Sequence, residues 1–159
     1  MYESGDKVFH PMHGIGVIES IVSQVVMGEK RKYYIVNLTT KKMEISVPVE
    51  SADEIGIRRI GKSQMIEDAL GVLKKKLVSD APTEWNQRFK FNMAKIKTGN
   101  IKELAQVLVN LRLRSKKSRL SISEMLMMDN VVSLIAGELS YSKDIEYEEA
   151  KKHIEKALN

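Results

Sequence analysis

The composition of this chain changes abruptly near residue 60, and that change limits what the chain can fold into. Glycine and β-branched residues dominate before this point, whereas residues that favour helices dominate after it. At roughly 150 residues per domain, a length of 159 residues would by itself suggest one domain. Because the pattern divides this length in two, we expect the α+β fold class, with domains at residues 1–59 and 60–159.

The N-terminal part predicts four or five short strands and shows no helical pattern. Residues 17–26 are rich in Val and Ile, residues 33–38 form a second strand-like run, and residues 43–47 alternate between apolar and polar. Two glycines within residues 13–16 predict a tight bend, and residues 27–30 are a candidate hairpin loop. We therefore expect a small, strongly bent β-barrel of the SH3-like or Tudor-like kind. Such a sheet keeps a free strand edge that can dock a partner strand.

The C-terminal part predicts five helices in a compact bundle, each with an apolar stripe and residues that favour its ends. The fourth opens with a capping box of Ser121 and Glu124. Its inward residues are expected to be Ile122, Met125, Met128, Val132, Ile135 and Leu139. The first of the other helices has as its inward residues Ile66, Ala69, Leu70, Leu73 and Leu77. The second is capped by Thr83 or Asp80 and ends near Lys97. The third begins at Asn100, and its inward residues are Ile101, Leu104, Ala105, Leu108 and Leu111. The last begins at about Ser142, and its inward residues are Ala150, Ile154, Ala157 and Leu158.

The formal net charge of +5 is concentrated in one segment of the chain. Residues 1–59 hold eight Lys or Arg against eight Asp or Glu, whereas residues 60–119 hold fourteen against five. Residues 120–159 reverse the sign, with four basic and eight acidic residues. A strongly basic stretch in a small protein points to an anionic partner, and nucleic acid is the first candidate.

Several function classes lack the residues they need. The chain has no Cys, which excludes disulfides and cysteine nucleophiles. Its three His show no metal-ligand spacing, and no phosphate-binding or nucleophile motif is present. Residues 1–6 are acidic and polar, unlike a signal peptide, and no apolar run approaches the ~18 residues of a membrane span. We therefore expect a cytoplasmic protein without enzymatic activity, metal or cofactor.

Five cations within eight residues form the densest basic run of the chain. They could form a solvated face at the end of a helix, where cations favour the helix dipole, or they could contact phosphates. The position of the run in the basic segment favours phosphate contact. Its members are Arg112, Arg114, Lys116, Lys117 and Arg119.

The single tryptophan, Trp85, stands near the start of a predicted helix. On a helical wheel the buried face of that helix is formed by Phe89, Met93 and Ile96, with Trp85 at its edge. Arg88, Asn92 and Lys95 fall on the outer side. Trp85 is either a core residue or a ring presented to a DNA groove, where inserted apolar wedges hold distorted DNA.

The chain resembles the CarD/CdnL family of bacterial RNA polymerase-binding transcription regulators. The resemblance extends over both domains. It is carried by the opening at residues 5–16, the strand end Val47–Pro48, the helix start at residues 82–90 followed by Gly99, the stretch from residue 111 to residue 121, and Gly137–Leu139. The opening alone also resembles the polymerase-interacting module of transcription-repair coupling factor.

The resemblance implies a mechanism. A Tudor-like N-terminal domain binds the β subunit of RNA polymerase by adding strands edge to edge. The helical domain contacts promoter DNA at the upstream edge of the −10 element, without strong sequence specificity. A tryptophan wedges into the minor groove at the fork of the transcription bubble and slows bubble collapse. At the matching positions, the wedge is Trp85 and its cationic neighbours are Arg88 and Lys90.

We therefore expect a monomeric, non-enzymatic transcription regulator that stabilises the open promoter complex. Some family members have arginines at two polymerase-facing positions where this chain has Gln24 and Ser46. The remaining alternatives are a protein–protein adaptor with a solvated basic face and an RNA-binding module. The expected polymerase contacts are Gln24, Lys41, Lys42, Glu44 and Ser46. The expected DNA contacts are Trp85, Asn86, Arg88, Lys90, Arg112, Arg114, Lys116, Lys117 and Arg119.

Overall fold

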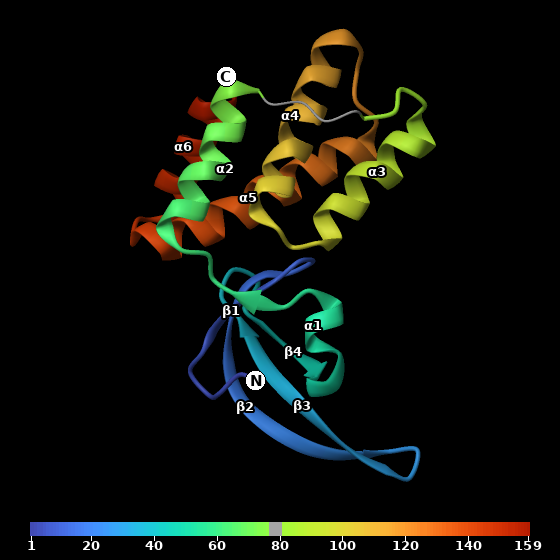
Figure 1. Ribbon diagram of the computed structural model, residues 1–159, viewed down its shortest axis with the longest axis vertical. Helices are drawn as coiled ribbons and strands as arrows, with labels where there is room; N and C mark the ends of the chain where they lie inside the picture. The colour runs from blue at the N-terminus through green and yellow to red at the C-terminus, as the bar shows by residue number, and fades with distance from the viewer. Residues whose placement is uncertain (77–80) are drawn as a thin grey trace. The chain divides into compact units, whose positions relative to one another are not determined.

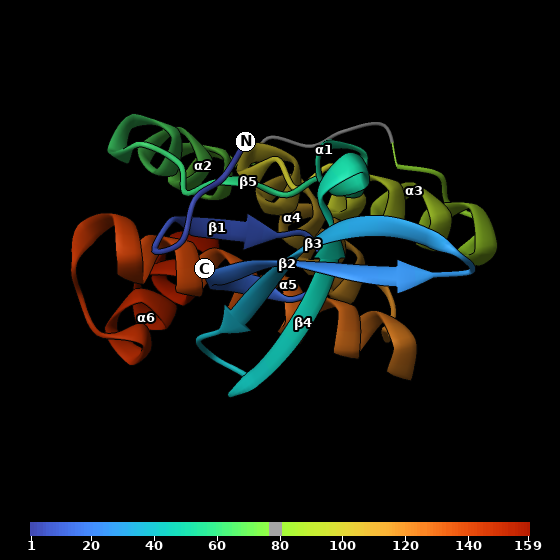
Figure 2. The same ribbon diagram turned by 90° about the horizontal axis from the view of Figure 1, so that it is seen from below.

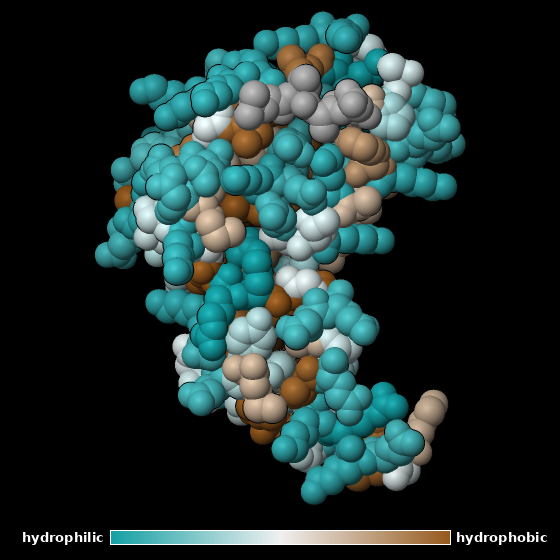
Figure 3. All heavy atoms as spheres, viewed as in Figure 1, coloured by the Kyte–Doolittle hydropathy of each residue, from teal (hydrophilic) through white to brown (hydrophobic). Residues whose placement is uncertain are grey.

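The computed structural model describes residues 1–76 and 81–159 of the chain (Figure 1). The chain divides into two compact units, Met1–Ile60 and Gly61–Asn159, one residue after the expected boundary. Hydrophilic side chains cover most of the face shown in Figure 3, in both units. The first unit is built on a β-sheet and the second on α-helices.

A five-stranded antiparallel sheet forms the first unit, with the strand order β4-β3-β2-β1-β5. Figure 2 shows β1 beside β2 and the long hairpin of β2 and β3. Strands β4 and β5 lie at the two ends of this order, so β4 is an edge strand. The strands are β1 (Lys7–His10), β2 (Gly14–Val26), β3 (Glu29–Leu38), β4 (Met43–Pro48) and β5 (Arg58–Arg59).

Alternation places the core on one face of the sheet. In β3, Tyr34, Val36 and Leu38 are buried and the residues between them are less buried or exposed, as period-two geometry requires. The predicted alternation of β4 is confirmed from Glu44 to Val47, where Val47 is buried, Ile45 is half-buried and the polar residues are exposed, whereas Met43 is 46% exposed. The cluster is completed by Val8, Ile18, Ala52 and Ile57.

The predicted glycine bend and the predicted hairpin loop have different outcomes. Gly14 has a φ of 83°, which suits a bend, but Gly16 lies within β2. A Cβ on Gly16 would lie 2.5 Å from Val36 Cγ1, so close packing explains this glycine. The hairpin loop between β2 and β3 is confirmed in place but is shorter than predicted, because residues 29 and 30 belong to β3. Its two residues Met27 and Gly28 have φ values of 51° and 79°. Positive φ at both central residues matches the twist of a tight hairpin.

The first unit contains a short helix that the sequence pattern did not predict. After Pro48 the chain forms the 3₁₀ turn η1 (Val49–Ser51) and then α1 (Ala52–Ile55), which ends at Gly56 with a φ of 97°. Four residues are too few to show a helical period, so the expectation of strands without helix was wrong here. The turn brings Ala52 and Ile57 into the sheet core.

Five α-helices make up the described part of the second unit, the number expected. Helix α4 is central and packs against α2, α3 and α5, while α6 packs against α5 and α2 (Figure 1). All five residues of the apolar stripe predicted for α4, from Ile101 to Leu111, are buried. The helices are α2 (Ser63–Lys75), α3 (Trp85–Lys97), α4 (Ile101–Lys117), α5 (Ile122–Lys143) and α6 (Tyr147–Leu158).

The remaining helix predictions are partly confirmed. The inward residues of α2 from Ile66 to Leu73 and those of α6 are buried, whereas Leu77 lies outside the described residues. The last helix begins at Tyr147 and not near Ser142, because α5 continues to Lys143. Asp144, with a φ of 53°, then ends α5 in the left-handed conformation.

Candidate functional site

Trp85 is the first residue of α3 and lies at the surface of the second unit. Its side chain is 40% exposed, and the following Asn86 and Gln87 are exposed as well. The helix is capped by Glu84, whose carboxylate accepts hydrogen bonds from the backbone N–H groups of Asn86 and Gln87 at 3.1 and 3.0 Å. The cap is therefore not Thr83, and Asp80 lies outside the described residues.

Two contacts fix the indole of Trp85. Its ring stacks on Phe89 with 5.4 Å between centroids and 22° between planes. Its Nε1–H donates to Ser121 Oγ at 3.1 Å. One face and the polar edge of the ring are thus engaged while much of its carbon surface stays open. Of the two interpretations of Trp85, the exposed ring describes this structure better than a core residue.

Arg88 is buried, so its expected place on the outer face of the helix is wrong. Its guanidinium makes a bidentate ion pair with Glu124, from Nε to Oε2 at 2.9 Å and from Nη2 to Oε1 at 3.1 Å. Nη1 donates to the carbonyl of Thr83 at 2.6 Å. Because its donors bond to these partners inside the unit, Arg88 is not available as a surface contact for DNA.

The ion pair shifts both pKa values in the direction of the charged forms. The hydrogen bond from Arg88 is the main cause that lowers the pKa of Glu124, against the opposing effect of burial. The hydrogen bond to Glu124 likewise raises the pKa of Arg88. Both groups are therefore charged near neutral pH, as a buried pair must be.

Asn92 lies one helical turn beyond Arg88 and is also buried. Its Oδ1 accepts a hydrogen bond from Asn110 Nδ2 on α4 at 3.2 Å. The buried face of α3 is consequently Arg88, Asn92 and Ile96, whereas Phe89 and Met93 are half-buried. The helical wheel was centred on the apolar residues and so missed two polar residues that find partners on other helices.

The predicted capping box of α5 is confirmed and connects to the same site. Ser121 Oγ accepts from the Glu124 backbone N–H at 3.1 Å, and the Ser121 backbone N–H donates to Glu124 Oε1 at 3.4 Å. Ser121 therefore contacts both Trp85 and Glu124, and Glu124 contacts Arg88. We call these four residues, Trp85, Arg88, Ser121 and Glu124, the Trp85 network.

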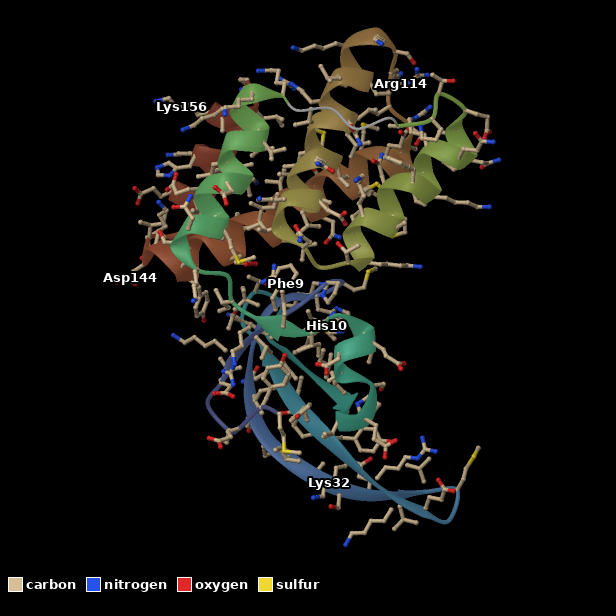
Figure 4. All side chains as sticks on the ribbon, viewed as in Figure 1. Phe9, His10, Lys32, Arg114, Asp144 and Lys156 are labelled. Carbon is tan, nitrogen blue, oxygen red and sulfur yellow. The ribbon has the colours of Figure 1, made fainter. Side chains whose placement is uncertain are left out.

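The basic run at the end of α4 divides between two environments. Arg112 Nη2 donates to Asn159 Oδ1. Arg114 and Lys117 line a hollow of about 160 Å³ together with Thr83 and Arg88, beside the start of α3. Figure 4 labels Arg114 on α4. Lys116, Lys117 and Arg119 are exposed, as is Lys90 on α3, whereas Arg112 and Arg114 are half-buried.

The first turns of α5 expose apolar side chains that were expected inside. Ile122 is 73% exposed and Met125 is 41% exposed, so their inward assignment was wrong. Leu126, which sequence reasoning did not single out, is 64% exposed. The buried positions there are Glu124, Met127 and Val131. Because Glu124 is charged, the sequence pattern did not indicate that it is buried. Its position in the capping box was the one signal that its carboxylate has a hydrogen-bond partner.

In the first unit, four of the five expected polymerase contacts lie on β4 or in the turn before it. Lys41 and Lys42 form that turn, and Glu44 and Ser46 are exposed on the edge strand. The register aligns Ser46 with Ile35 and Ser20, whereas Gln24 pairs with Arg31 on the part of the hairpin beyond β4. Figure 4 labels Lys32 on this exposed part of the hairpin. A hydrogen bond with the Glu19 carboxyl raises the pKa of Glu44.

A titratable cluster lies where β1 turns into β2. The rings of His10 and His13 are 4.7 Å apart, and Lys41 Nζ lies 3.4 Å from His13 Nδ1. His10 is buried, and its Nδ1 accepts the Met12 backbone N–H at 3.1 Å (Figure 4). Burial lowers the pKa of His10 to about 4, with His13 and Lys41 adding to the effect. Burial and Lys41 also lower the pKa of His13.

Among residues 1–76 and 81–159, no group of three His, Asp or Glu side chains lies together in the way that a bound metal ion would need. Within the same residues, no helix has both the length and the apolar character of a membrane crossing.

Comparison with known proteins gives matches over both units. Residues 2–61 match a family model described as "CarD-like/TRCF RID domain", and residues 68–155 match one described as "CarD, C-terminal domain". A protein of Bacillus subtilis (strain 168) named "Putative transcription factor YdeB" is 32% identical over 151 residues, which cover 95% of this chain and 98% of that protein.

Proposed function

The chain belongs to the CarD family of transcription regulators, and we propose that it holds promoters open by binding RNA polymerase and DNA together. The observation that carries this proposal is Trp85, a ring that is 40% exposed at the first residue of α3 and held on two sides. An apolar ring of this kind suits insertion at a base step of the minor groove, where a wedge holds distorted DNA. In this proposal the protein acts without catalysing a reaction and without a cofactor.

Phosphate contacts would hold this wedge in place. Lys116, Lys117 and Arg119 are exposed at the end of α4, and Arg114 lines the hollow beside the start of α3. Their role is to orient the second unit on the DNA, since phosphate contacts fix position but carry little sequence information. A wedge that binds the open complex better than the closed duplex shifts the equilibrium toward the open state by the difference in affinity.

The first unit supplies the link to polymerase in this proposal. Its edge strand β4 can pair with a strand of the polymerase β subunit through backbone hydrogen bonds. Lys41 and Lys42 stand at the start of that edge. Gln24 and Ser46 contribute uncharged contacts where arginines stand in some relatives. The protein acts as a monomer that bridges its two partners.

Binding measurements test this bridge. A pull-down with the polymerase β subunit compares the wild type with Trp85→Ala and with the double variant Lys41→Glu, Lys42→Glu. We expect Trp85→Ala to bind as the wild type does and the double variant to bind less. Tyr141→Ala, which removes another exposed aromatic ring of the second unit, is the matched control.

Nucleic-acid binding without polymerase separates this function from its rivals. We expect weak binding to promoter duplex that falls steeply with salt concentration, because phosphate contacts release counterions. Tight, sequence-specific binding to duplex DNA alone would contradict the bridge. A clear preference for RNA would instead identify an RNA-binding module.

A further inference from the structure

The Trp85 network joins segments that are far apart in the sequence. Trp85 and Arg88 belong to α3, whereas Ser121 caps α5 and Glu124 lies in its first turn. The contacts run from the indole N–H to Ser121 Oγ, from Ser121 to the Glu124 carboxylate, and from that carboxylate to Arg88. Arg88 completes the circuit by donating to the carbonyl of Thr83, two residues before Trp85. Both sides of the helix start are therefore tied to α5.

The ion pair of Arg88 and Glu124 at the centre of this network is buried, and its burial is not explained by stability alone. Arg88 and Glu124 have side chains only 8% and 1% exposed, at an N–O distance of 2.9 Å. Removing two charges from water costs as much as their attraction returns, so apolar residues of similar volume often serve stability equally well. What such a pair can provide is a single geometry, since the planar guanidinium matches the carboxylate through two parallel hydrogen bonds.

The network also determines which part of the ring is open. The Nε1–H group is the only hydrogen-bond donor of an indole, and in this structure Ser121 accepts it. The exposed part of the ring is therefore carbon. A minor groove offers acceptors on every base pair, and a free indole N–H could bond to them. With its donor engaged, the ring can stack or wedge but cannot favour one base by hydrogen bonding.

We propose that Ser121, Glu124 and Arg88 are positioning residues that hold the Trp85 indole in its DNA-binding orientation before DNA arrives and keep its N–H from the bases. This inference rests on the proposed function, because the proposed function makes DNA the partner of the Trp85 ring. Holding the ring in advance reduces the conformational entropy that binding would otherwise cost. The wedge is thereby rigid, apolar and indifferent to base identity.

Ser121 is the residue at which positioning can be separated from helix capping. Ser121→Gly removes the acceptor for the indole, but glycine is a tolerated N-cap, so α5 should lose little stability. Ser121→Thr keeps both the acceptor and the cap and serves as the rescue. The Trp85→Phe background keeps an aromatic ring without an N–H, so a true positioning effect of Ser121 should vanish there.

The first measurement uses the full chain without polymerase. Exchange of the indole N–H with solvent and the anisotropy decay of Trp85 fluorescence report on the ring, the single tryptophan of the chain. We expect faster exchange and faster ring motion in Ser121→Gly, and wild-type values in Ser121→Thr. Unchanged values in Ser121→Gly would overturn the positioning role, whatever the protein does at promoters.

The second measurement is the lifetime of open promoter complexes. In the chain that keeps Trp85, we expect Ser121→Gly to reduce the gain in open-complex lifetime roughly two- to tenfold, which is the factor that one net hydrogen bond contributes. In the Trp85→Phe background the same substitution should add nothing. An equal loss in both backgrounds would overturn the proposal in favour of a capping effect. If Trp85→Ala itself leaves the lifetime unchanged, the proposed function fails, and the exchange measurement alone then decides whether the network positions the ring.

Discussion

The two units of this chain bury polar side chains to different extents. Among the described residues of Met1–Ile60, the buried polar groups are His10 and the hydroxyl of Tyr34, which accepts a hydrogen bond from the Tyr2 backbone N–H at 3.1 Å, and the remaining core is apolar. The described residues of Gly61–Asn159 bury a larger set, which includes Arg88, Asn92, Asn110, Glu124 and Glu138. The first unit is thus built on an alternating apolar pattern. The second adds a polar framework, and part of that framework surrounds Trp85.

Breaking the Arg88–Glu124 pair should give the largest effect and confine it to the second unit. In Glu124→Ala the guanidinium stays buried without its carboxylate, and α5 loses part of its capping box. We expect the free energy of unfolding of this unit to fall by roughly 3–5 kcal/mol. Denaturation followed by Trp85 fluorescence measures it, and amide signals of the sheet serve as the internal comparison.

Glu148→Ala, which removes an exposed carboxylate from the first turn of α6, is the matched control for this variant. It should change stability by less than ~0.5 kcal/mol, as surface substitutions usually do. A similar small loss in Glu124→Ala would show that the pair is not part of the framework. Equal losses in both units would remove the contrast between them.

Acid should act first on the first unit, through His10. Its pKa is about 4 when folded, against 6.5 for an ordinary histidine, so the unfolded chain binds more protons between these values. The stabilisation is full above pH 6.5 and is lost progressively as the pH falls toward 4. Amide exchange of the sheet against pH measures the loss, and His10→Gln should flatten it. A folded-state pKa near 6.5 would contradict the account.

The carboxylate of the second unit should respond at lower pH. The pKa of Glu124 is below its ordinary 4.5, so its contribution is present above 4.5 and disappears only as the pH falls through the lowered value. Trp85 fluorescence should therefore hold steady across the range in which the sheet weakens. An indole signal that changes together with the sheet amides would contradict this order.

Two glycines offer a smaller test with opposite signs. In Gly16→Ala the new Cβ would meet Val36 Cγ1 at 2.5 Å and Asn37 O at 3.2 Å, so we expect a loss of roughly 1–3 kcal/mol. Gly71→Ala in α2 meets no atom within 4 Å and should add roughly 0.5–1 kcal/mol through helix propensity. Thermal unfolding of each unit measures both changes. Losses at both positions would refute the contrast.

Periodicity predicted the apolar framework of both units well. The alternation around Val47, the stripe from Ile101 to Leu111 and the capping box of Ser121 and Glu124 all appear in the structure. These features arise from local geometry, which a sequence shows directly. The helix α1 escaped notice because a single turn has no period to detect.

Sequence reasoning failed where a polar residue is buried against a partner from a distant segment. Arg88 and Glu124 are 36 residues apart, and nothing in either local pattern reveals the other. The helical wheel therefore placed Arg88 outside, and the α5 stripe placed Ile122 inside, although the structure reverses both. Trp85 was singled out as a candidate from the sequence and stays a prediction, whereas its exposure and its bond to Ser121 could be seen only in the fold.

One measurement tests the central claim most directly. Open complexes formed on one promoter fragment with saturating protein are challenged with a competitor, and their dissociation rate is compared for the wild type and Trp85→Ala. We predict that Trp85→Ala binds polymerase normally but loses most of the slowing of dissociation. Wild-type slowing by Trp85→Ala, with its fold and polymerase binding intact, would contradict the account.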